Sequence, residues 1–213
     1  MIAIVDYGMG NLRSVEKAVE YVGGVATITS QVAMLETAQG VILPGVGAFG
    51  DAMANLRARQ LIEPLVDQIS SGKPFLGICL GMHLLFEVGE EMGRHEGLGV
   101  LAGRVVRFRD GDLKVPHVGW NELHVQQQSP ILAGVADGSY AYFVHSYYAV
   151  PRDAAIVVAT TQYGVEYASV VGQGNLFGAQ FHPEKSQDAG LRIIRNFVGI
   201  IDQHSGNVPT EGD

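Results

Sequence analysis

The chain has 213 residues, of which 47% are hydrophobic and 17% charged, with 28 glycines, one cysteine and a formal net charge of −8. This length and composition predict one compact globular domain. The excess of acidic side chains argues against nucleic acid as a partner, because affinity for a polyanion comes from neutralising its phosphates. One cysteine excludes an internal disulfide and the paired thiols of a zinc ribbon. Because the seven histidines also include no pair at i, i+4, we expect no metal.

No apolar run is long enough to span a membrane, and the N-terminus lacks the pattern of a signal peptide. We therefore expect a cytoplasmic protein that does not associate with a membrane. Gly8-Met9-Gly10 does not continue into a dinucleotide fingerprint, because Arg13 stands where the third glycine belongs. We expect no nucleotide or other cofactor.

Short apolar runs alternate with amphipathic segments in the first half of the chain, which predicts a mostly parallel sheet covered by helices, an α/β fold. Asp51 is a suitable N-cap for the second predicted helix, and Pro64 predicts a kink or a break within it. In chain order, strands are expected at residues 2–5, 25–29, 40–43 and 74–78, and helices at 12–22, 51–70 and 80–87.

The second half is rich in β-formers separated by tight turns, which predicts antiparallel strands that extend or flank the sheet. These strands are expected at 104–108, 140–150, 155–161, 165–171 and 176–181, followed by a helix at 188–201. We expect a single domain over residues 1–203 and a polar tail over 204–213.

Cys79 lies between two glycines, Gly77 and Gly81, at the point where the fourth strand should turn into a helix. This is the form of G-x-S-x-G with cysteine as the nucleophile. Glycines on both sides remove side chains that would collide in the turn, and the helix N-terminus directs its N–H groups at the sulfur. The pattern favours a reactive thiol over a buried core cysteine, with the N–H of Leu80 as a donor to an oxyanion.

A thiol nucleophile needs a base and a group that orients the base, and His182-Pro183-Glu184 offers both. Pro183 favours an extended conformation at His182, and in an extended segment residues i and i+2 point to the same side. Leu43-Pro44-Gly45-Val46-Gly47 also follows a strand, so it is expected beside Cys79 at the carboxyl edge of the sheet. Its backbone could supply further N–H donors, or it could be a plain turn between strand and helix.

These three motifs, in this order and with these separations, resemble the class I, or triad, glutamine amidotransferases, a family with a flavodoxin-like fold. Further segments resemble the glutaminase subunits of imidazole glycerol phosphate synthases, and together they cover essentially the whole domain. They are Asp6-Tyr-Gly-Met-Gly-Asn-Leu-Arg-Ser-Val15, Val46-Gly-Ala-Phe-Gly50, His117-Val-Gly-Trp-Asn121, Tyr142-Phe-Val-His-Ser-Tyr147 and Gln180-Phe-His-Pro-Glu-Lys-Ser186.

The resemblance implies hydrolysis of L-glutamine in histidine biosynthesis through a γ-glutamyl thioester on Cys79. His182 would be base and acid, and Glu184 would orient it. The oxyanion hole would be formed by Gly45, Val46 and Leu80. The family's glutamine contacts would fall on Gly47, Glu91, His145, Ser146 and Tyr147.

His83 departs from the family, which usually has glutamine four residues after the nucleophile. A helix would place it one turn from Cys79. It could replace the glutamine amide as a substrate contact or merely fill space. No acidic residue is placed in the sequence to orient it as a base.

The ammonia produced should be used before it is protonated and lost, and the 213 residues contain no second domain to use it. The resemblance implies a heterodimer with a (β/α)8-barrel cyclase subunit, with Asn11, Trp120 and Lys185 near the interface. Alternative hypotheses are the glutaminase of another synthase, such as pyridoxal phosphate synthase, a cysteine-dependent γ-glutamyl hydrolase, or a non-catalytic flavodoxin-like binding subunit.

Overall fold

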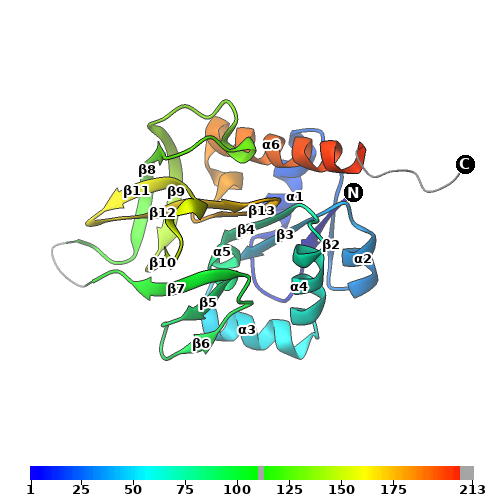
Figure 1. Cartoon of the computed structure of the whole chain (residues 1–213), viewed down its shortest axis with the longest axis horizontal. Coiled ribbons are helices and arrows are strands. Elements are labelled where there is room, and N and C mark those ends of the chain that lie inside the picture. Colours follow the sequence, from blue (N-terminus) through cyan, green and yellow to red (C-terminus); the bar gives the residue numbers. More distant parts are fainter. Residues whose placement is uncertain (110–112, 207–213) are drawn as a thin grey trace, which may run out of the picture.

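The computed structural model describes residues 1–109 and 113–206, and within these ranges nine strands form one large sheet (Figure 1). The first five strands of this sheet are parallel, and each of the other four is antiparallel to its neighbour. The order across the sheet is β2 (Ala26–Thr29), β1 (Ile2–Val5), β3 (Gly40–Gly45), β4 (Phe75–Cys79), β13 (Leu176–Ala179), β12 (Val165–Gln173), β11 (Val157–Tyr163), β8 (His117–Val125) and β9 (Ser139–His145).

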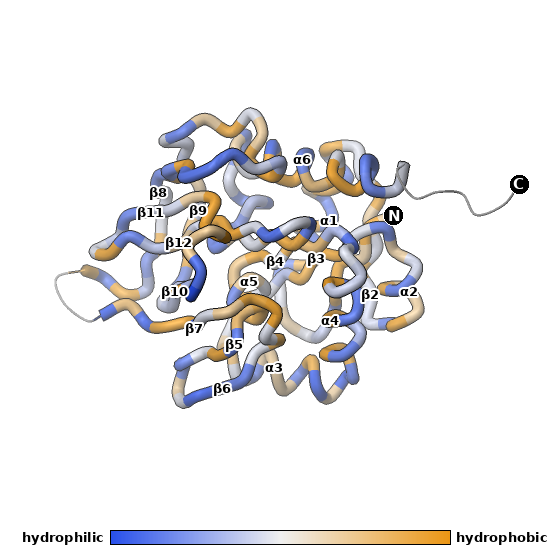
Figure 2. Tube along the Cα trace, in the orientation of Figure 1, coloured by the Kyte–Doolittle hydropathy of each residue, from blue (hydrophilic) through white to orange (hydrophobic). Residues whose placement is uncertain are grey.

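Helices cover both faces of the parallel part, which leaves its central strands buried on both sides. The strands β3 and β4 are buried at every residue, and Figure 2 shows that they are largely apolar. One face is covered by α1 (Leu12–Tyr21) and α6 (Gln187–Gly206), and the other by α2 (Val32–Thr37), α3 (Phe49–Ala58) and α4 (Ile62–Ser70) (Figure 1).

A second sheet of four strands lies beside α3 in the described part of the chain (Figure 1). Its order is β10 (Tyr147–Pro151), β7 (Leu101–Arg107), β5 (Phe86–Gly89) and β6 (His95–Glu96). Ser146 alone separates β9 of the large sheet from β10 of the small one. The chain therefore passes from one sheet to the other at this residue.

The α/β class and the mostly parallel sheet agree with the sequence prediction, whereas several boundaries differ. The run expected as one strand over 140–150 is divided at Ser146 between the two sheets. The helix expected over 80–87 ends at Leu84, because Phe86 pairs with Leu101 in the small sheet. The helix expected over 51–70 is broken at 59–61, and Pro64 lies in the first turn of α4, where proline is tolerated.

Three further differences concern helix ends and omitted elements. Ala48, and not Asp51, is the N-cap of α3. The sequence prediction omitted α2, β6 and β8. The helix α6 continues to Gly206, so residues 204–206 of the expected tail are helical, and 207–213 lie outside the described residues.

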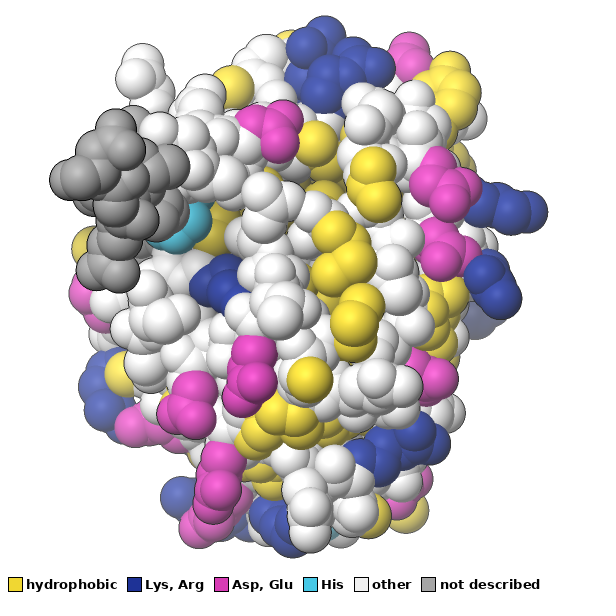
Figure 3. Space-filling model, turned by 90° about the vertical axis from the view of Figure 1, so that its right-hand side faces the viewer, with side chains coloured by type: hydrophobic (Ala, Val, Ile, Leu, Met, Phe, Trp, Pro, Cys, Tyr) yellow, Lys and Arg dark blue, Asp and Glu magenta, His cyan; other side chains and the backbone are white. Residues whose placement is uncertain are grey.

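Acidic and basic side chains are interspersed over the face shown in Figure 3, so on this face charge of either sign is distributed rather than gathered at one spot. None of the helices in the described part of the chain combines the length and the apolar character that crossing a bilayer requires.

Candidate active site

Cys79 occupies a sharp turn between β4 and the short helix α5 (Leu80–Leu84). Its φ is 53°, a value that few residues with a side chain adopt. A Cβ on Gly81 would lie 1.7 Å from the carbonyl oxygen of Leu43, and one on Gly77 would lie 2.7 Å from the carbonyl oxygen of Gly81. The two flanking glycines therefore allow α5 to start directly against β3 and β4.

His182 and Glu184 follow β13, the parallel neighbour of β4, and thus reach the same edge of the sheet as Cys79. Nδ1 of His182 lies 2.8 Å from Oε1 of Glu184, and the two side chains are 3% and 0% exposed. The sequence predicted that an extended segment would bring them together. The structure corrects this, because His182 is extended but Pro183–Lys185 form a 3₁₀ turn.

Hydrogen bonds from two other segments, and one from Ser186 at the end of the same turn, hold this pair in place. The backbone N–H of His182 donates to the carbonyl of Tyr142 on β9 at 3.1 Å, and the hydroxyl of Ser186 donates to the carbonyl of His182 at 2.7 Å. Nδ2 of Asn11 donates to Oε1 of Glu184 at 3.5 Å. The backbone of His182 and the carboxylate that contacts its Nδ1 are thus both held by hydrogen bonds.

The electrostatic environment makes His182 an unusually strong base. Burial lowers its pKa, but the interactions with the Cys79 sulfur and the Glu184 carboxylate outweigh burial and raise the pKa to about 10. Because Nδ1 faces Glu184, Nε2 is the ring nitrogen left to interact with the sulfur. An imidazole with this pKa is cationic at neutral pH, so a positive charge lies beside the nucleophile.

A cavity of about 390 Å³ opens at this edge of the sheet and contains both Cys79 and His182. All six residues predicted to contact substrate line it, and the wall also includes Val46 and Leu80 of the predicted oxyanion hole. The structure adds Pro116 and Val144, which the sequence interpretation did not name. The predicted substrate contacts in the wall are Gly47, His83, Glu91, His145, Ser146 and Tyr147.

Two of the predicted oxyanion-hole residues belong to neighbouring elements. Gly45 is buried and pairs with Cys79 in the β3–β4 register, so the Gly45–Gly47 segment begins beside the nucleophile. Leu80 is the first residue of α5, and its N–H has no acceptor within the helix. Glu91 accepts a hydrogen bond at 2.7 Å from the N–H of Phe49, which holds its carboxylate at the N-terminus of α3.

His83 lies within hydrogen-bond distance of Gln180, with 2.7 Å between Nε2 and Oε1. Burial lowers the pKa of His83 to about 4, although this hydrogen bond acts in the opposite direction. The ring is therefore neutral at pH 7. Its hydrogen-bond partner is an amide and not a carboxylate, which agrees with the expectation that His83 has no acid to orient it.

Three further polar residues adjoin the site and were not identified as site residues from the sequence: Tyr7, His117 and Gln180. All three are buried. The Tyr7 hydroxyl has no hydrogen-bond partner among the described residues, and burial followed by the charge of Cys79 raises its pKa. Each of the three residues belongs to a motif quoted in the sequence analysis, so the sequence did contain a signal for them.

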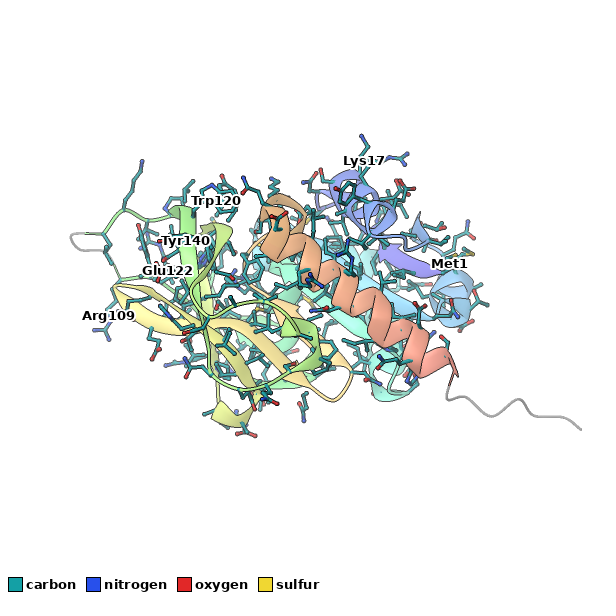
Figure 4. The ribbon with its side chains drawn as sticks, turned by 90° about the horizontal axis from the view of Figure 1, so that it is seen from above. Met1, Lys17, Arg109, Trp120, Glu122 and Tyr140 are labelled. Carbon is teal, nitrogen blue, oxygen red and sulfur yellow. The ribbon has the colours of Figure 1, made fainter. Side chains whose placement is uncertain are left out.

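The predicted partner-interface residues lie outside the cavity. The side chain of Trp120 is 46% exposed on β8, where Figure 4 shows it near Tyr140 and Glu122, and Lys185 is also exposed. Asn11 is half-buried and contacts Glu184. Over residues 1–109 and 113–206, no group of three or more His, Cys, Asp or Glu side chains is arranged to hold a metal ion.

Comparison with known proteins places the whole of this architecture in one family. The family described as glutamine amidotransferase class-I matches residues 3–200. Curated relatives are described as "Imidazole glycerol phosphate synthase subunit HisH". The one from Desulfitobacterium hafniense is 54% identical over 92% of this chain and 93% of its own. The one from Rhodopirellula baltica is 54% identical over 93% of this chain and 97% of its own.

Solved structures share the fold at lower sequence identity. "Structure of PurLQS from Thermotoga maritima" superposes with a TM-score of 0.75 at 21% identity, over 93% of this chain and 97% of that one. A structure described as "Crystal structure of glutamine amidotransferase" gives a TM-score of 0.73 at 21% identity, over 93% of this chain and 100% of that one. The chain therefore belongs to the class-I glutamine amidotransferase family and, within it, to the HisH subunits of imidazole glycerol phosphate synthase.

Proposed function

We propose that this chain is the glutamine-hydrolysing subunit of an imidazole glycerol phosphate synthase and releases glutamate and ammonia from L-glutamine. The observation that carries the proposal is the cavity in which a cysteine at a strained turn meets a histidine held by a buried carboxylate. The identity of about one half to the HisH relatives supports the same assignment.

The charges in the cavity suit a free amino acid. Glu91 offers a carboxylate to the α-ammonium group, and the backbone amides of Ser146 and Tyr147 can donate to the α-carboxylate. Bound in this way, glutamine directs its side-chain amide toward Cys79. His83 lines the same cavity as a neutral polar group.

In the first step the Cys79 sulfur attacks the amide carbon of glutamine. The developing oxyanion would be stabilised by the N–H of Leu80 and by the Gly45–Val46 backbone. The His182 imidazolium then gives its Nε2 proton to the departing nitrogen, so that ammonia leaves and a γ-glutamyl thioester remains. Glu184 stabilises the cationic ring throughout.

In the second step the same histidine becomes a base. The thioester sulfur carries no negative charge, so the largest of the interactions that raise the pKa of His182 is lost while burial continues to lower it. The neutral ring can then accept a proton from water, which attacks the thioester carbonyl. Glutamate leaves and the thiolate–imidazolium pair is restored.

A cyclase subunit that uses the ammonia would bind at the surface of this chain, and one surface is suited to such a partner. Four apolar side chains on the outer side of the β8–β9 hairpin are exposed, with fractions of 54% for Val118, 46% for Trp120, 55% for Tyr140 and 38% for Val144. Solvated strands normally carry polar residues on that side. We assign this surface, with Asn11 and Lys185, to the (β/α)8-barrel cyclase, which would form imidazole glycerol phosphate and aminoimidazole carboxamide ribotide.

The test of the chemistry is release of glutamate from glutamine by the purified chain with the cyclase and its ribotide substrate. We expect His182→Ala to reduce turnover by roughly 10³-fold or more, as removal of a member of a catalytic triad does. His83→Ala should retain measurable turnover. If His182→Ala remained active and His83→Ala were inactive, the assignment of the base would be wrong.

A glutamine-mimicking electrophile such as diazo-oxo-norleucine tests the nucleophile without a partner. We expect one covalent label per chain on Cys79 and none in Cys79→Ala. An unlabelled wild-type protein would indicate a non-catalytic binding subunit. Capture of a different synthase subunit, such as that of pyridoxal phosphate synthase, would contradict the assignment to histidine biosynthesis.

A further inference from the structure

The inner side of the β8–β9 hairpin carries a chain of hydrogen bonds that the proposed chemistry does not use. Its members are Asn121, His117 and His145, which lie on alternate positions of the two strands and face the protein interior. His117 and His145 are 3% and 7% exposed. This series of hydrogen bonds ends at the backbone of Tyr147, in the wall of the cavity.

The donor and acceptor directions in this series of hydrogen bonds are fixed at Asn121. Its Nδ2 donates to the carbonyl of Gln162 at 3.0 Å, while its Oδ1 accepts from the N–H of Glu122 at 2.9 Å. The amide is thus oriented with Nδ2 toward Nε2 of His117 at 3.3 Å. An N–H group facing this nitrogen requires it to accept, so the neutral His117 ring carries its proton on Nδ1.

From His117 the chain continues to His145 by two routes. Nδ1 of His117 lies 3.2 Å from Nε2 of His145, and it also lies 3.3 Å from the Tyr167 hydroxyl, which is itself 3.2 Å from Nε2 of His145. Either route makes Nε2 of His145 an acceptor. His145 therefore carries its proton on Nδ1, which donates to the carbonyl of Tyr147 at 2.8 Å.

Both rings are neutral, as this arrangement requires. Burial lowers the pKa of His117 to about 4 and that of His145 to about 3. At pH 7 each imidazole consequently carries a proton on one of its two nitrogens. The neighbouring groups are compatible with that proton on Nδ1 only.

At its Tyr147 end, this series of hydrogen bonds adjoins the Ser146–Tyr147 peptide, which faces the cavity. The carbonyl of Ser146 accepts from the N–H of Phe108 at 3.0 Å, and the carbonyl of Tyr147 accepts from His145. Because the peptide bond is planar and trans, the N–H of Tyr147 points away from Phe108. Two consecutive carbonyls are held, and the amide between them has a single direction.

We propose that His117 and Asn121 are positioning residues, which select the Nδ1–H tautomer of His145 and thereby hold the Ser146–Tyr147 backbone in the orientation that binds the glutamine α-carboxylate. This inference rests on the proposed binding of glutamine in the cavity. Neither residue touches the substrate, and their effect passes through His145.

The first test reads the tautomers directly and does not depend on activity. In ¹⁵N NMR spectra of the full chain at pH 7, His117 and His145 should both show a protonated Nδ1 and an unprotonated Nε2. An Nε2–H tautomer at His145 would overturn the proposal, even if the protein hydrolysed glutamine normally. Correct tautomers in a protein without glutaminase activity would instead refute the proposed function.

The second test separates hydrogen bonding from packing, because His117 also stacks on Phe143 and Tyr163 with ring centroids 5.0 and 3.9 Å away. His117→Phe keeps the stacked ring and removes the donor, whereas His117→Asn keeps a donor near the position of Nδ1 and removes the ring. We expect His117→Phe to raise KM for glutamine about tenfold with little change in kcat, since about one hydrogen bond is lost. We expect His117→Asn to lower Tm more but to keep KM within about threefold of wild type.

If KM in the two variants instead followed Tm, His117 would have only a packing role and the proposal would be wrong. A parallel loss of kcat in His117→Phe would also contradict it, because the positioning acts on binding of the α-carboxylate and not on the attacking sulfur.

Discussion

Substitution of Gly81 by alanine is the most direct test of how the nucleophile is held. The new Cβ would lie 1.7 Å from the carbonyl oxygen of Leu43, which belongs to the central strand β3. This oxygen is part of the backbone and not the end of a flexible side chain. To reach ordinary contact, α5 and β3 must separate by more than about 1 Å.

The magnitude follows from this displacement. Overpacking a core typically costs about 1–3 kcal/mol, and movement of a central strand places this variant near the upper value. For a chain of this length about 1 kcal/mol corresponds to roughly 2–4 °C, so Tm should fall by about 6–12 °C. Because α5 begins immediately after Cys79, a misplacement of about 1 Å should also reduce kcat by roughly 10²-fold.

The assay combines thermal unfolding with turnover of glutamine in the presence of the partner. Gly199→Ala is the matched control, since a Cβ at this position in α6 has no atom within 4 Å. It should raise Tm slightly, because alanine is favoured over glycine by up to about 1 kcal/mol within a helix. A Gly81→Ala protein with unchanged Tm and turnover would refute the reasoning about the turn.

Three further predictions concern single groups. Cys79→Ala should lower the pKa of His182 from about 10, because the sulfur provides the largest upward contribution. In wild type the histidine stabilises the fold below about pH 6.5, its ordinary pKa, and this stabilisation is lost as the pH rises toward 10. NMR titration measures the pKa in both proteins, and pH-dependent unfolding measures the stability. An unchanged pKa of His182 in Cys79→Ala would contradict the prediction. Tyr7→Phe should raise Tm by about 2–4 °C, because it removes a buried hydroxyl without a partner. Tyr140→Phe is the control at an exposed position and should change Tm by less than about 2 °C. A lower Tm for Tyr7→Phe would show that the hydroxyl has an acceptor. Trp120→Ala should leave Tm and diazo-oxo-norleucine labelling unchanged. It should weaken binding of the cyclase by about tenfold or more, as measured by titration calorimetry. Equal affinity of the variant and wild type would exclude the β8–β9 surface as the interface.

The local features of the site were predictable because they depend on short segments. The turn at Cys79 needs glycine at two fixed positions, and His182 and Glu184 are two residues apart, so the sequence alone indicates their proximity. The parallel order of β1, β3 and β4 follows from apolar runs separated by helical segments. The first two of these inferences depend only on residues that are close together in the sequence.

The remaining features depend on tertiary partners that a single sequence does not reveal. The run of β-formers over 140–150 is continuous, yet it contributes to two sheets, because Ser139–His145 pair with β8 and Tyr147–Pro151 with β7. The end of α5 is likewise set by pairing of Phe86 with a residue fifteen positions later. His117 and Gln180 lie in motifs quoted from the sequence, but their roles depend on rings from other elements. These are His145 and Tyr167 for His117, and His83 for Gln180.

The passage of the chain between two sheets at Ser146 divides the proposed site into two halves. Cys79, Gly45 and the turn that carries His182 extend from the large sheet, whereas Tyr147 begins β10 and Glu91 follows β5, both in the small sheet. The amide end of glutamine would thus react on one layer while its amino-acid end is recognised by the other. Recognition and chemistry can then be altered separately, and the small sheet is the place to redesign the class of amino acid that the cavity accepts.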